Sequence, residues 1–406
     1  MKKLLLIPII ALAFVPTLLT NHYSLTTAAV GGFPDDYCDG LSVSGAIHGH
    51  EPAITAKAAF LMEANSGKVL FQHNADKQLP IASMVKVMTL AICYDELDAG
   101  NITLDQKVMV SREAGGMGGS QAFLDFDNEY PVEELIKSIV IASANDSCVA
   151  MAELIAGSES EFVNRMNTLA QTLGMKDTNY ANCTGLPAPG AHSTAADMAK
   201  VYAHIMKSPH FATNNKVWMY DLTHPSGRVT GLTNTNKHSR FFNGCCGGKT
   251  GFTNEAGHCI TVSATRGEMR PVAVIIGASD SKTRFAESAA LMNFAFNGFE
   301  NKLVIPADKS VGQIKLKSAM DDKVDVYPAR NFFDLVKKGD KGEPTITIEI
   351  NETAKAPITA TDSVGKATIT RGGQTVGEID LVTNTDIESL TYWGSVKKTV
   401  RTFRLF

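Results

Sequence analysis

Two residues three positions apart, Ser83 and Lys86, have side chains suited to nucleophilic catalysis. The stretch from Ile81 to Leu90 is otherwise almost entirely apolar and follows Pro80, so it predicts the opening of a buried helix. Residues three apart share a helix face, and the hydroxyl and the amine would therefore lie side by side. Burial makes the ammonium form of Lys86 costly and lowers its pKa, which supplies a base beside the nucleophile.

The S-x-x-K spacing has little weight by itself, because it recurs elsewhere, at Ser279/Lys282, Ser363/Lys366 and Ser395/Lys398. Two further motifs give it context. Ser143-Ala144-Asn145 begins 60 residues after Ser83, and Lys249-Thr250-Gly251, the only K-T-G in the chain, begins 106 residues after Ser143. The order S-x-x-K, S-x-N, K-T-G is the signature of active-site-serine enzymes that recognise penicillin.

The first 29 residues predict export. Lys2 and Lys3 precede an apolar run from Leu4 to Leu19, and small residues follow at Thr27-Ala28-Ala29, as in a secretory signal peptide cleaved near Ala28 or Ala29. An uncleaved anchor is the alternative, although the run is short for the roughly 20 residues of a spanning helix. Either way we expect the body, with residues 30–50 as a lead-in segment, to act on the extracytoplasmic face of the cell membrane.

Composition narrows the functional class. With 44% hydrophobic and 20% charged residues the chain is an ordinary globular protein, and its length favours two domains. The net charge of −4 argues against nucleic acid as a partner. The seven cysteines include no C-x-x-C with a matching histidine pair, so we expect no metal and no cofactor. Cys246 and Cys259 could form a disulfide across a hairpin; free buried thiols are the alternative.

The elements around these motifs predict an α+β fold for residues 51–300. Two strands, 58–63 and 68–71, flank the turn residues Asn65-Ser66-Gly67 and form a hairpin. Helical patterns follow near 131–136, 145–156, 159–173 and 198–206, then strands at 257–264 and 270–277 and a closing helix at 284–299. Strands at both ends with helices between them indicate one sheet built from distant segments, flanked by helices and a helical lobe.

The last hundred residues change in character. Short alternating strands at 303–306, 345–350, 367–370 and 377–382, separated by turn residues, predict a small all-β domain over 301–385. Residues 386–406 predict an amphipathic helix. Its apolar side would carry Tyr392, Trp393, Val396, Val400, Phe403 and Phe406, and its basic side Lys397, Lys398, Arg401 and Arg404. This pattern is typical of a helix that lies on a membrane surface, and packing on the β-domain is the alternative.

With these motifs in place, the chain resembles the low-molecular-weight penicillin-binding proteins of the serine-type D-alanyl-D-alanine carboxypeptidase family. The likeness covers nearly the whole length and includes the segments at 143–152, 175–180 and 248–257. It implies a β-lactamase/transpeptidase-like catalytic domain, followed by the β-domain and the terminal helix. It also implies two kinds of partner, which are peptidoglycan stem peptides ending in D-Ala-D-Ala as substrates and β-lactam antibiotics as inhibitors.

The resemblance further implies a role for each motif residue. Ser83 would attack the substrate carbonyl, Lys86 would take its proton, and Ser143 would pass a proton to the leaving D-alanine. The substrate-binding residues would be Asn145, Lys249, Thr250, Gly251 and Phe252. Among these, Lys249 would keep the site positive, Thr250 would bind the terminal carboxylate, and the N–H groups of Ser83 and Phe252 would form the oxyanion hole.

Three alternatives use the same chemistry. A class A β-lactamase would carry a glutamate followed four residues later by asparagine, and no such pair lies between Asn145 and Lys249. A penicillin sensor would be acylated without turnover, and an endopeptidase would cut cross-links between stem peptides.

Two departures from the family pattern, Ala196 and the pair Cys245-Cys246, concern fine substrate contacts. Arg284 could bind the substrate carboxylate, although a solvated charge at a helix start is the simpler interpretation.

Overall fold

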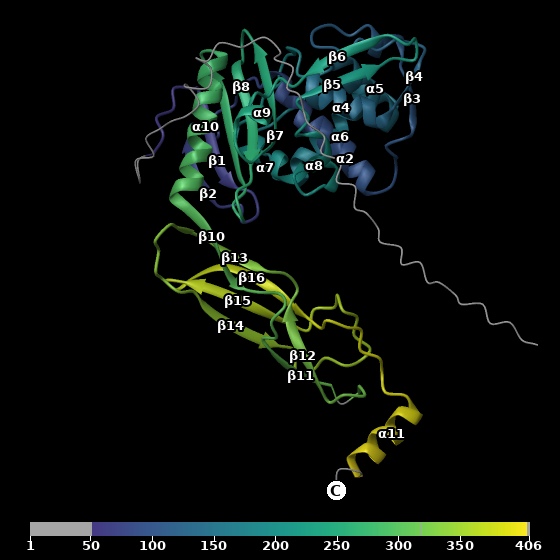
Figure 1. Ribbon diagram of the computed structural model, residues 1–406, viewed down its shortest axis with the longest axis vertical. Coiled ribbons are helices and arrows are strands. Elements are labelled where there is room, and N and C mark those ends of the chain that lie inside the picture. The colour runs from purple at the N-terminus through teal and green to yellow at the C-terminus, as the bar shows by residue number, and fades with distance from the viewer. Residues whose placement is uncertain (1–50, 317, 404–406) are drawn as a thin grey trace, which may run out of the picture. The chain divides into compact units, whose positions relative to one another are not determined.

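The computed structural model describes residues 51–316 and 318–403 (Figure 1). The predicted signal peptide and lead-in therefore lie outside the described residues. The first domain is built on a five-stranded sheet in the order β2-β1-β9-β8-β7, with every neighbouring pair antiparallel. Its strands are β1 (Ala58–Glu63), β2 (Val69–His73), β7 (Cys245–Thr253), β8 (Gly257–Ala264) and β9 (Pro271–Ala278).

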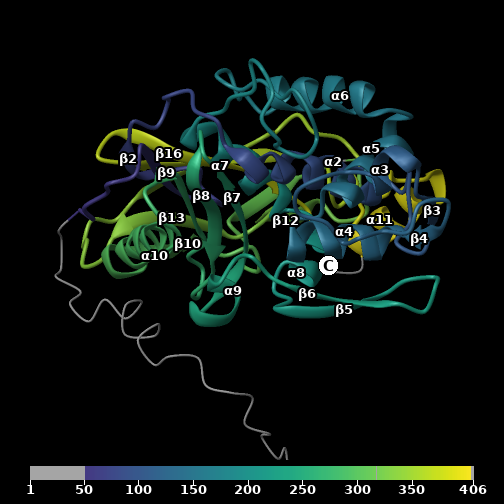
Figure 2. The ribbon, with the colours of Figure 1, turned by 90° about the horizontal axis from the view of Figure 1, so that it is seen from above.

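Both faces of this sheet are largely buried along β1, β7, β8 and β9, whereas the edge strand β2 is partly exposed. Alternate residues of each strand point to opposite sides. On one face Ala59, Leu61 and Ile275 pack against α10 (Ser281–Gly298), whereas on the other Phe60 and Val274 join the core of the helical lobe. Figure 2 shows α10 and α7 (Ala195–Ile205) on opposite sides of β8 and β9. Since strands from both ends of the domain pair in one sheet, the predicted α+β fold is confirmed.

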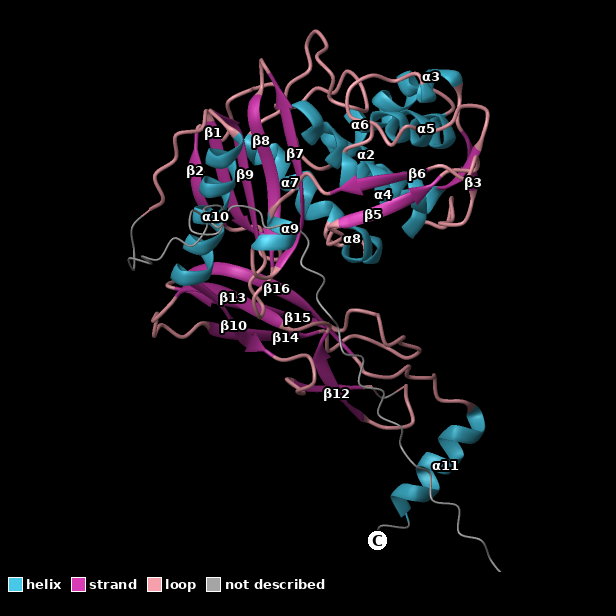
Figure 3. Ribbon diagram, turned by 45° about the horizontal axis from the view of Figure 1, so that its top comes forward, coloured by secondary structure: helices cyan, strands magenta, loops and turns pink. Residues whose placement is uncertain are grey.

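The helical lobe lies beyond the β7 edge of the sheet (Figure 3). Its central element is the buried helix α2 (Lys86–Asp98), preceded by the short 3₁₀ helix η1 (Ala82–Val85). The other helices of the lobe are α3 (Arg112–Gly115), α4 (Val132–Ala142), α5 (Asn145–Ala156), α6 (Glu159–Thr172) and α8 (Pro209–Asn214), whereas α9 (His238–Phe241) packs against β7 and α10. Two antiparallel strand pairs complete the lobe: β3 (Lys107–Met109) with β4 (Glu129–Pro131), and the hairpin of β5 (Met219–Thr223) with β6 (Val229–Thr233).

The helix ends follow ordinary capping chemistry. Pro131 precedes the first turn of α4, where its missing N–H costs nothing, and Glu133 and Glu134 lie in that turn. The side chains of Ser158 and Thr194 cap α6 and α7 by accepting backbone N–H bonds. The predicted helices at 145–156, 159–173 and 198–206 match α5, α6 and α7, with α7 beginning three residues earlier than expected.

The second domain begins where α10 ends, at Phe299. Strand β10 (Phe299–Ile305) pairs with β13 (Phe332–Lys337), and a five-stranded sheet has the order β11-β12-β16-β15-β14. Its strands are β11 (Gly312–Lys315), β12 (Lys323–Pro328), β14 (Thr345–Ile350), β15 (Gly365–Arg371) and β16 (Gln374–Val382). A separate apolar core that includes Ile314, Val326 and Ile369 confirms the all-β domain, although the sequence pattern missed β11, β12 and β13.

Helix α11 (Tyr392–Phe403) falls within the predicted amphipathic segment. Tyr392 and Trp393 are 78% and 72% exposed, and Val396 and Val400 are also exposed. Lys398 bonds the carbonyl of Ala319 and pairs with Asp322. The predicted Arg404 and Phe406 lie outside the described residues, as do the side chains of Arg401 and Phe403. Among the described residues, no helix has the length and apolarity needed to cross a membrane.

The hairpin disulfide considered from the sequence is wrong. In the β7–β8 register Cys259 lies opposite Gly251, whereas Cys246 lies at the far end of β7, beside the residues that pair with Ser263 and Ala264. All six described cysteines are buried free thiols, in agreement with the alternative expectation. Burial raises the pKa of the Cys148 and Cys259 thiols, to about 12 and about 11, so these thiols are held in the neutral form.

Candidate active site

Ser83 lies in η1, one residue after a strained position, rather than in the α-helix that the sequence predicted. Ala82 has φ +48°, a left-handed conformation that is uncommon for a residue with a side chain. The turn leaves Ser83 partly exposed while Lys86, the first residue of α2, is fully buried. Lys86 Nζ donates to Ser83 Oγ at 3.1 Å and to the carbonyl of Thr184. The expected serine–lysine pair is therefore formed.

Ser143 lies at the junction of α4 and α5. It adopts a left-handed conformation, φ +62°, as the C-cap of α4, and Asn145 opens α5 two residues later. Neither side chain makes a capping hydrogen bond at the N-terminus of α5. Ser143 Oγ accepts a hydrogen bond from Lys249 Nζ at 2.8 Å. The S-x-N and K-T-G motifs thus meet across 106 residues of chain.

Strand β7 brings the third motif to the nucleophile. A Cβ atom at Gly251 would lie 2.7 Å from the carbonyl oxygen of Ile81 and 3.1 Å from the nitrogen of Ser83, so only glycine permits this approach. Thr250 Oγ1 donates to Thr235 Oγ1 at 2.8 Å. Phe252 is exposed and stacks on His258, with ring centroids 4.3 Å apart. The Ser83 N–H and β7 are therefore neighbours, as an oxyanion hole would require.

Arg284 is neither a solvated charge nor an open ligand for substrate. It is 9% exposed, and its Nη1 donates to the carbonyls of Gly251 and Cys259 at 3.0 and 3.3 Å. The guanidinium thereby holds β7 and β8 from behind, because it bonds one carbonyl of each strand. Its place at the start of α10 predicted solvent exposure, and the packing of α10 on the sheet overrides that expectation.

Both lysines are buried, and burial lowers the pKa of each. For Lys86 the negative charge of Asp146 acts in the opposite direction. For Lys249 the positive charge of Lys86 adds to the effect of burial, and its pKa lies well below the ordinary value. The expected depression of the Lys86 pKa is therefore found. Burial likewise disfavours the charged form of Lys249, the residue that was expected to keep the site positive.

Sequence reasoning missed the loop that closes the other side of Ser83. Gly185 has φ +82°, and a Cβ atom there would lie 2.1 Å from the carbonyl oxygen of Ala82. The adjacent carbonyl of Thr184 accepts from Lys86. These residues lie about 100 positions from Ser83, and nothing in their spacing signals a contact. In the sequence, Thr184-Gly185 resembles an ordinary turn, so only the fold reveals the role of these two residues.

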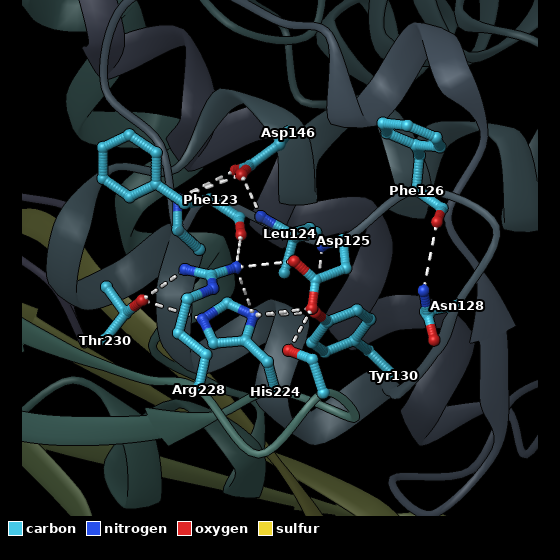
Figure 4. A network of polar contacts seen from close by, with 12 residues as sticks. Phe123, Leu124, Asp125, Phe126, Asn128, Tyr130, Asp146, His224, Arg228 and Thr230 are labelled. Carbon is cyan, nitrogen blue, oxygen red and sulfur yellow. Dashed lines mark hydrogen bonds and ion pairs between the residues drawn. The ribbon is translucent and has the colours of Figure 1, made fainter.

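A second unpredicted support is the segment 116–128, which lies along the start of α5. The carbonyl of Gly118 accepts from Asn145 Nδ2 and that of Ser120 accepts from the Asn145 backbone N–H, both at 2.7 Å. The buried carboxylate of Asp146 accepts from the N–H groups of Ala122 and Leu124 at 3.1 Å (Figure 4). Asn145 Oδ1 is left buried without a hydrogen-bond partner among the described residues.

The same segment is tied to the β5–β6 hairpin (Figure 4). Arg228 Nη2 pairs with Asp125 at 2.7 Å, and His224 Nδ1 lies 2.7 Å from the hydroxyl of Tyr130. His224 is buried, and burial together with the Arg228 charge lowers its pKa, which favours the neutral ring. In the described part of the chain, no cluster of His, Cys, Asp or Glu is arranged to hold a metal ion.

This geometry can be compared with known proteins. Residues 46–280 match the family model described as D-alanyl-D-alanine carboxypeptidase. The chain belongs to this family. Residues 299–389 match a second model, the C-terminal domain of penicillin-binding protein 5.

Individual relatives agree. The chain is 36% identical over 351 residues to D-alanyl-D-alanine carboxypeptidase DacF of Bacillus subtilis, covering 86% of this chain and 90% of that protein. A crystal structure of penicillin-binding protein 5 from Haemophilus influenzae has a TM-score of 0.69 at 28% identity, covering 84% of this chain and 99% of that one. Penicillin-binding protein 3 from Streptococcus pneumoniae has a TM-score of 0.71 at 25% identity, covering 83% and 100%. This chain is accordingly a serine-type D-alanyl-D-alanine carboxypeptidase.

Proposed function

We propose that Ser83 is the nucleophile with which this carboxypeptidase removes the terminal D-alanine from peptidoglycan stem peptides. The observation that carries the proposal is the pair of contacts from two buried lysines to two serines, Lys86 to Ser83 at 3.1 Å and Lys249 to Ser143 at 2.8 Å. A buried, neutral amine beside a hydroxyl is an activated nucleophile.

The substrate itself sets the charges of the two lysines. Its terminal carboxylate would bind the Thr250 hydroxyl and lie beside Lys249, where a negative charge favours the ammonium form of that lysine. A charged Lys249 then favours the neutral form of Lys86. The positive site expected from the sequence would thus arise when substrate binds, whereas burial disfavours it in the free protein.

In the acylation step Ser83 Oγ attacks the carbonyl carbon of the penultimate D-alanine and Lys86 takes the hydroxyl proton. The N–H groups of Ser83 and Phe252 would hold the oxyanion, with Gly251 allowing β7 to lie close enough. When the C–N bond breaks, Ser143 would pass its proton to the amine of the leaving D-alanine and receive in its place the proton held by Lys86, which leaves Lys86 neutral again. Water then attacks the ester carbon and gives a proton to Lys86. As the ester C–O bond breaks, Lys86 returns that proton to Ser83 Oγ and restores the hydroxyl.

Asn145 would bind the amide of the peptide on the acyl side of the scissile bond and help position Lys86. Its Nδ2 is already held by Gly118, so Oδ1 is the atom left for a ligand N–H. A β-lactam offers a similar amide, carbonyl and carboxylate, and attack by Ser83 would open its ring. Because the ring nitrogen stays attached to the acyl group, the product remains in the site and water is slow to displace it.

The test is an intact-mass time course of the full chain with benzylpenicillin, followed by an assay of D-alanine release from a peptide ending in D-Ala-D-Ala. Ser83→Ala should lose both the adduct and the release. Ser279→Ala is the matched control, because Ser279 begins another S-x-x-K and is exposed. An adduct that survives in Ser83→Ala would refute the assignment, an adduct that clears within seconds would indicate a β-lactamase, and a stable adduct without release would indicate a sensor.

We also propose that the chain is exported by its N-terminal segment and that α11 lies on the membrane surface. Exposed Tyr392 and Trp393 on a helix with a basic side support the second proposal, whereas the Lys398 contacts to Ala319 and Asp322 favour packing on the β-domain. Deleting residues 387–406 should release the protein from sedimenting lipid vesicles. A truncated chain that still sediments would refute the membrane role.

A further inference from the structure

Phe123 combines two features that both disfavour folding. Its backbone has φ +62°, which is a genuine outlier for a bulky aromatic residue, and its ring is 57% exposed. An exposed ring recovers little burial energy to offset the backbone strain. Strain of this kind persists only where the surroundings impose it, and it is concentrated at functional sites.

The residues around Phe123 impose its strained backbone conformation. The N–H groups of its two neighbours, Ala122 and Leu124, both donate to the Asp146 carboxylate at 3.1 Å. Its own carbonyl accepts from Arg228 Nη2 at 2.5 Å, and the same atom pairs with Asp125. Figure 4 shows the Phe123 ring pointing away from the Arg228 and His224 side chains. The network fixes the backbone on both sides of Phe123 and leaves the ring uncovered.

The segment that carries Phe123 is the one that holds Asn145. Gly118 and Ser120 bond the side-chain amide and the backbone N–H of Asn145. Across this segment lies another exposed apolar side chain, Leu186, whose Cδ2 would be 3.7 Å from a Cβ atom at Gly119. A peptide amide bound at Asn145 would place the preceding substrate residue near this segment, which carries the exposed Phe123 ring and has Leu186 beside it.

We propose that Phe123 is a specificity-determining residue whose ring packs against the aliphatic side chain of the stem-peptide residue that precedes D-Ala-D-Ala. The proposal rests on the proposed function, because it uses Asn145 as the anchor of the acyl-side amide. It explains why the fold maintains a strained and exposed aromatic residue: the ring is covered when substrate is bound.

Phe123→Gly separates this role from a structural one. Glycine adopts positive φ without strain, so the variant should keep or raise the melting temperature. For diacetyl-L-lysyl-D-Ala-D-Ala, whose long side chain would lie on the ring, kcat/KM should fall about tenfold, mostly through KM. For acetylglycyl-D-Ala-D-Ala, which lacks that side chain, the change should be less than twofold. Phe123→Leu should recover part of the selectivity.

Phe126→Ala is the matched control, because Phe126 is also exposed but is covered on one side by the Arg112 guanidinium, 4.6 Å from its ring centroid. It should leave the ratio of the two substrates unchanged. Equal losses for both substrates in Phe123→Gly, or no loss, would overturn the proposal. A wild-type chain that releases no D-alanine from either peptide would instead mark failure of the proposed function, on which the contact depends.

Discussion

Asp146 is the acceptor on which the segment next to Asn145 depends, and Asp146→Asn is therefore an informative change. Oδ1 accepts from the N–H of Ser147 at 2.9 Å, Oδ2 from that of Leu124 at 3.1 Å, and both oxygens lie 3.1 Å from the N–H of Ala122. An asparagine keeps the shape but has one oxygen. Whichever way its amide turns, a buried N–H, of Ser147 or of Leu124, faces an NH₂ group and loses its acceptor.

The magnitude follows from these bonds. An orphaned buried donor costs about 1–3 kcal/mol, and each remaining bond weakens by about 1 kcal/mol when its acceptor loses the charge. We expect the free energy of unfolding to fall by about 3–5 kcal/mol, measured by urea denaturation. Because Gly118 and Ser120 then hold Asn145 less firmly, kcat/KM for D-alanine release should fall at least about tenfold, which corresponds to about 1.4 kcal/mol.

The control is Asp105→Asn, which removes the same charge from an exposed carboxylate that bonds the Thr103 hydroxyl. It should leave both quantities nearly unchanged. A stability loss below about 1 kcal/mol in Asp146→Asn, together with wild-type activity, would refute the reasoning, since the carboxylate would then be replaceable by any polar group of that shape.

Two further changes test the packing behind the site. Gly185→Ala should slow acylation by benzylpenicillin at least about tenfold, because its Cβ would lie 2.1 Å from the Ala82 carbonyl oxygen. Gly190→Ala is the control and should leave the rate unchanged, since Gly190 has a similar φ of +78° but its nearest neighbour would lie at 3.8 Å. Equal acylation rates in the two variants would contradict the close approach of Gly185 to Ala82. Burial lowers the pKa of His238 from 6.5 to about 4. Only the unfolded chain binds this proton between those values, so stability should decrease by up to about 3 kcal/mol as the pH falls from 6.5 to 4. His238→Gln should remove that part of the pH dependence in urea denaturation, and an unchanged slope would contradict it.

Local patterns in the sequence were enough to predict much of the fold. The hairpin of β1 and β2 follows from two apolar runs on either side of the turn residues Asn65-Ser66-Gly67, and it pairs as expected. Helices α5 and α6 follow from apolar periodicity, and their bounds agree within a residue. Strands β11, β12 and β13 were missed because they are short and contain charged residues, and their identity depends on pairing with neighbours that lie far away in sequence.

The candidate site divides in the same way. Ser83, Lys86, Ser143, Asn145 and Lys249 lie in motifs that spacing alone reveals, and the structure brings them together. Sequence could not show that Arg284 is buried behind β7, because its exposure depends on how α10 packs. Sequence also could not show the protonation state of the lysines, because the burial of Lys249 and its distance from Lys86 are set by the tertiary structure.

By itself, then, the sequence determined which functional groups are present and in which order they occur, because a catalytic motif needs fixed residue types at short spacing. Only the tertiary structure decided how these groups are held. Segments tens of residues apart are joined by the contact of Gly185 with Ala82 and by the hydrogen bonds that Asn145 donates to Gly118 and Ser120. The strained turn at Phe123 is likewise held by residues distant in sequence. Such contacts arise from packing and hydrogen bonding across the fold, and no local spacing encodes them.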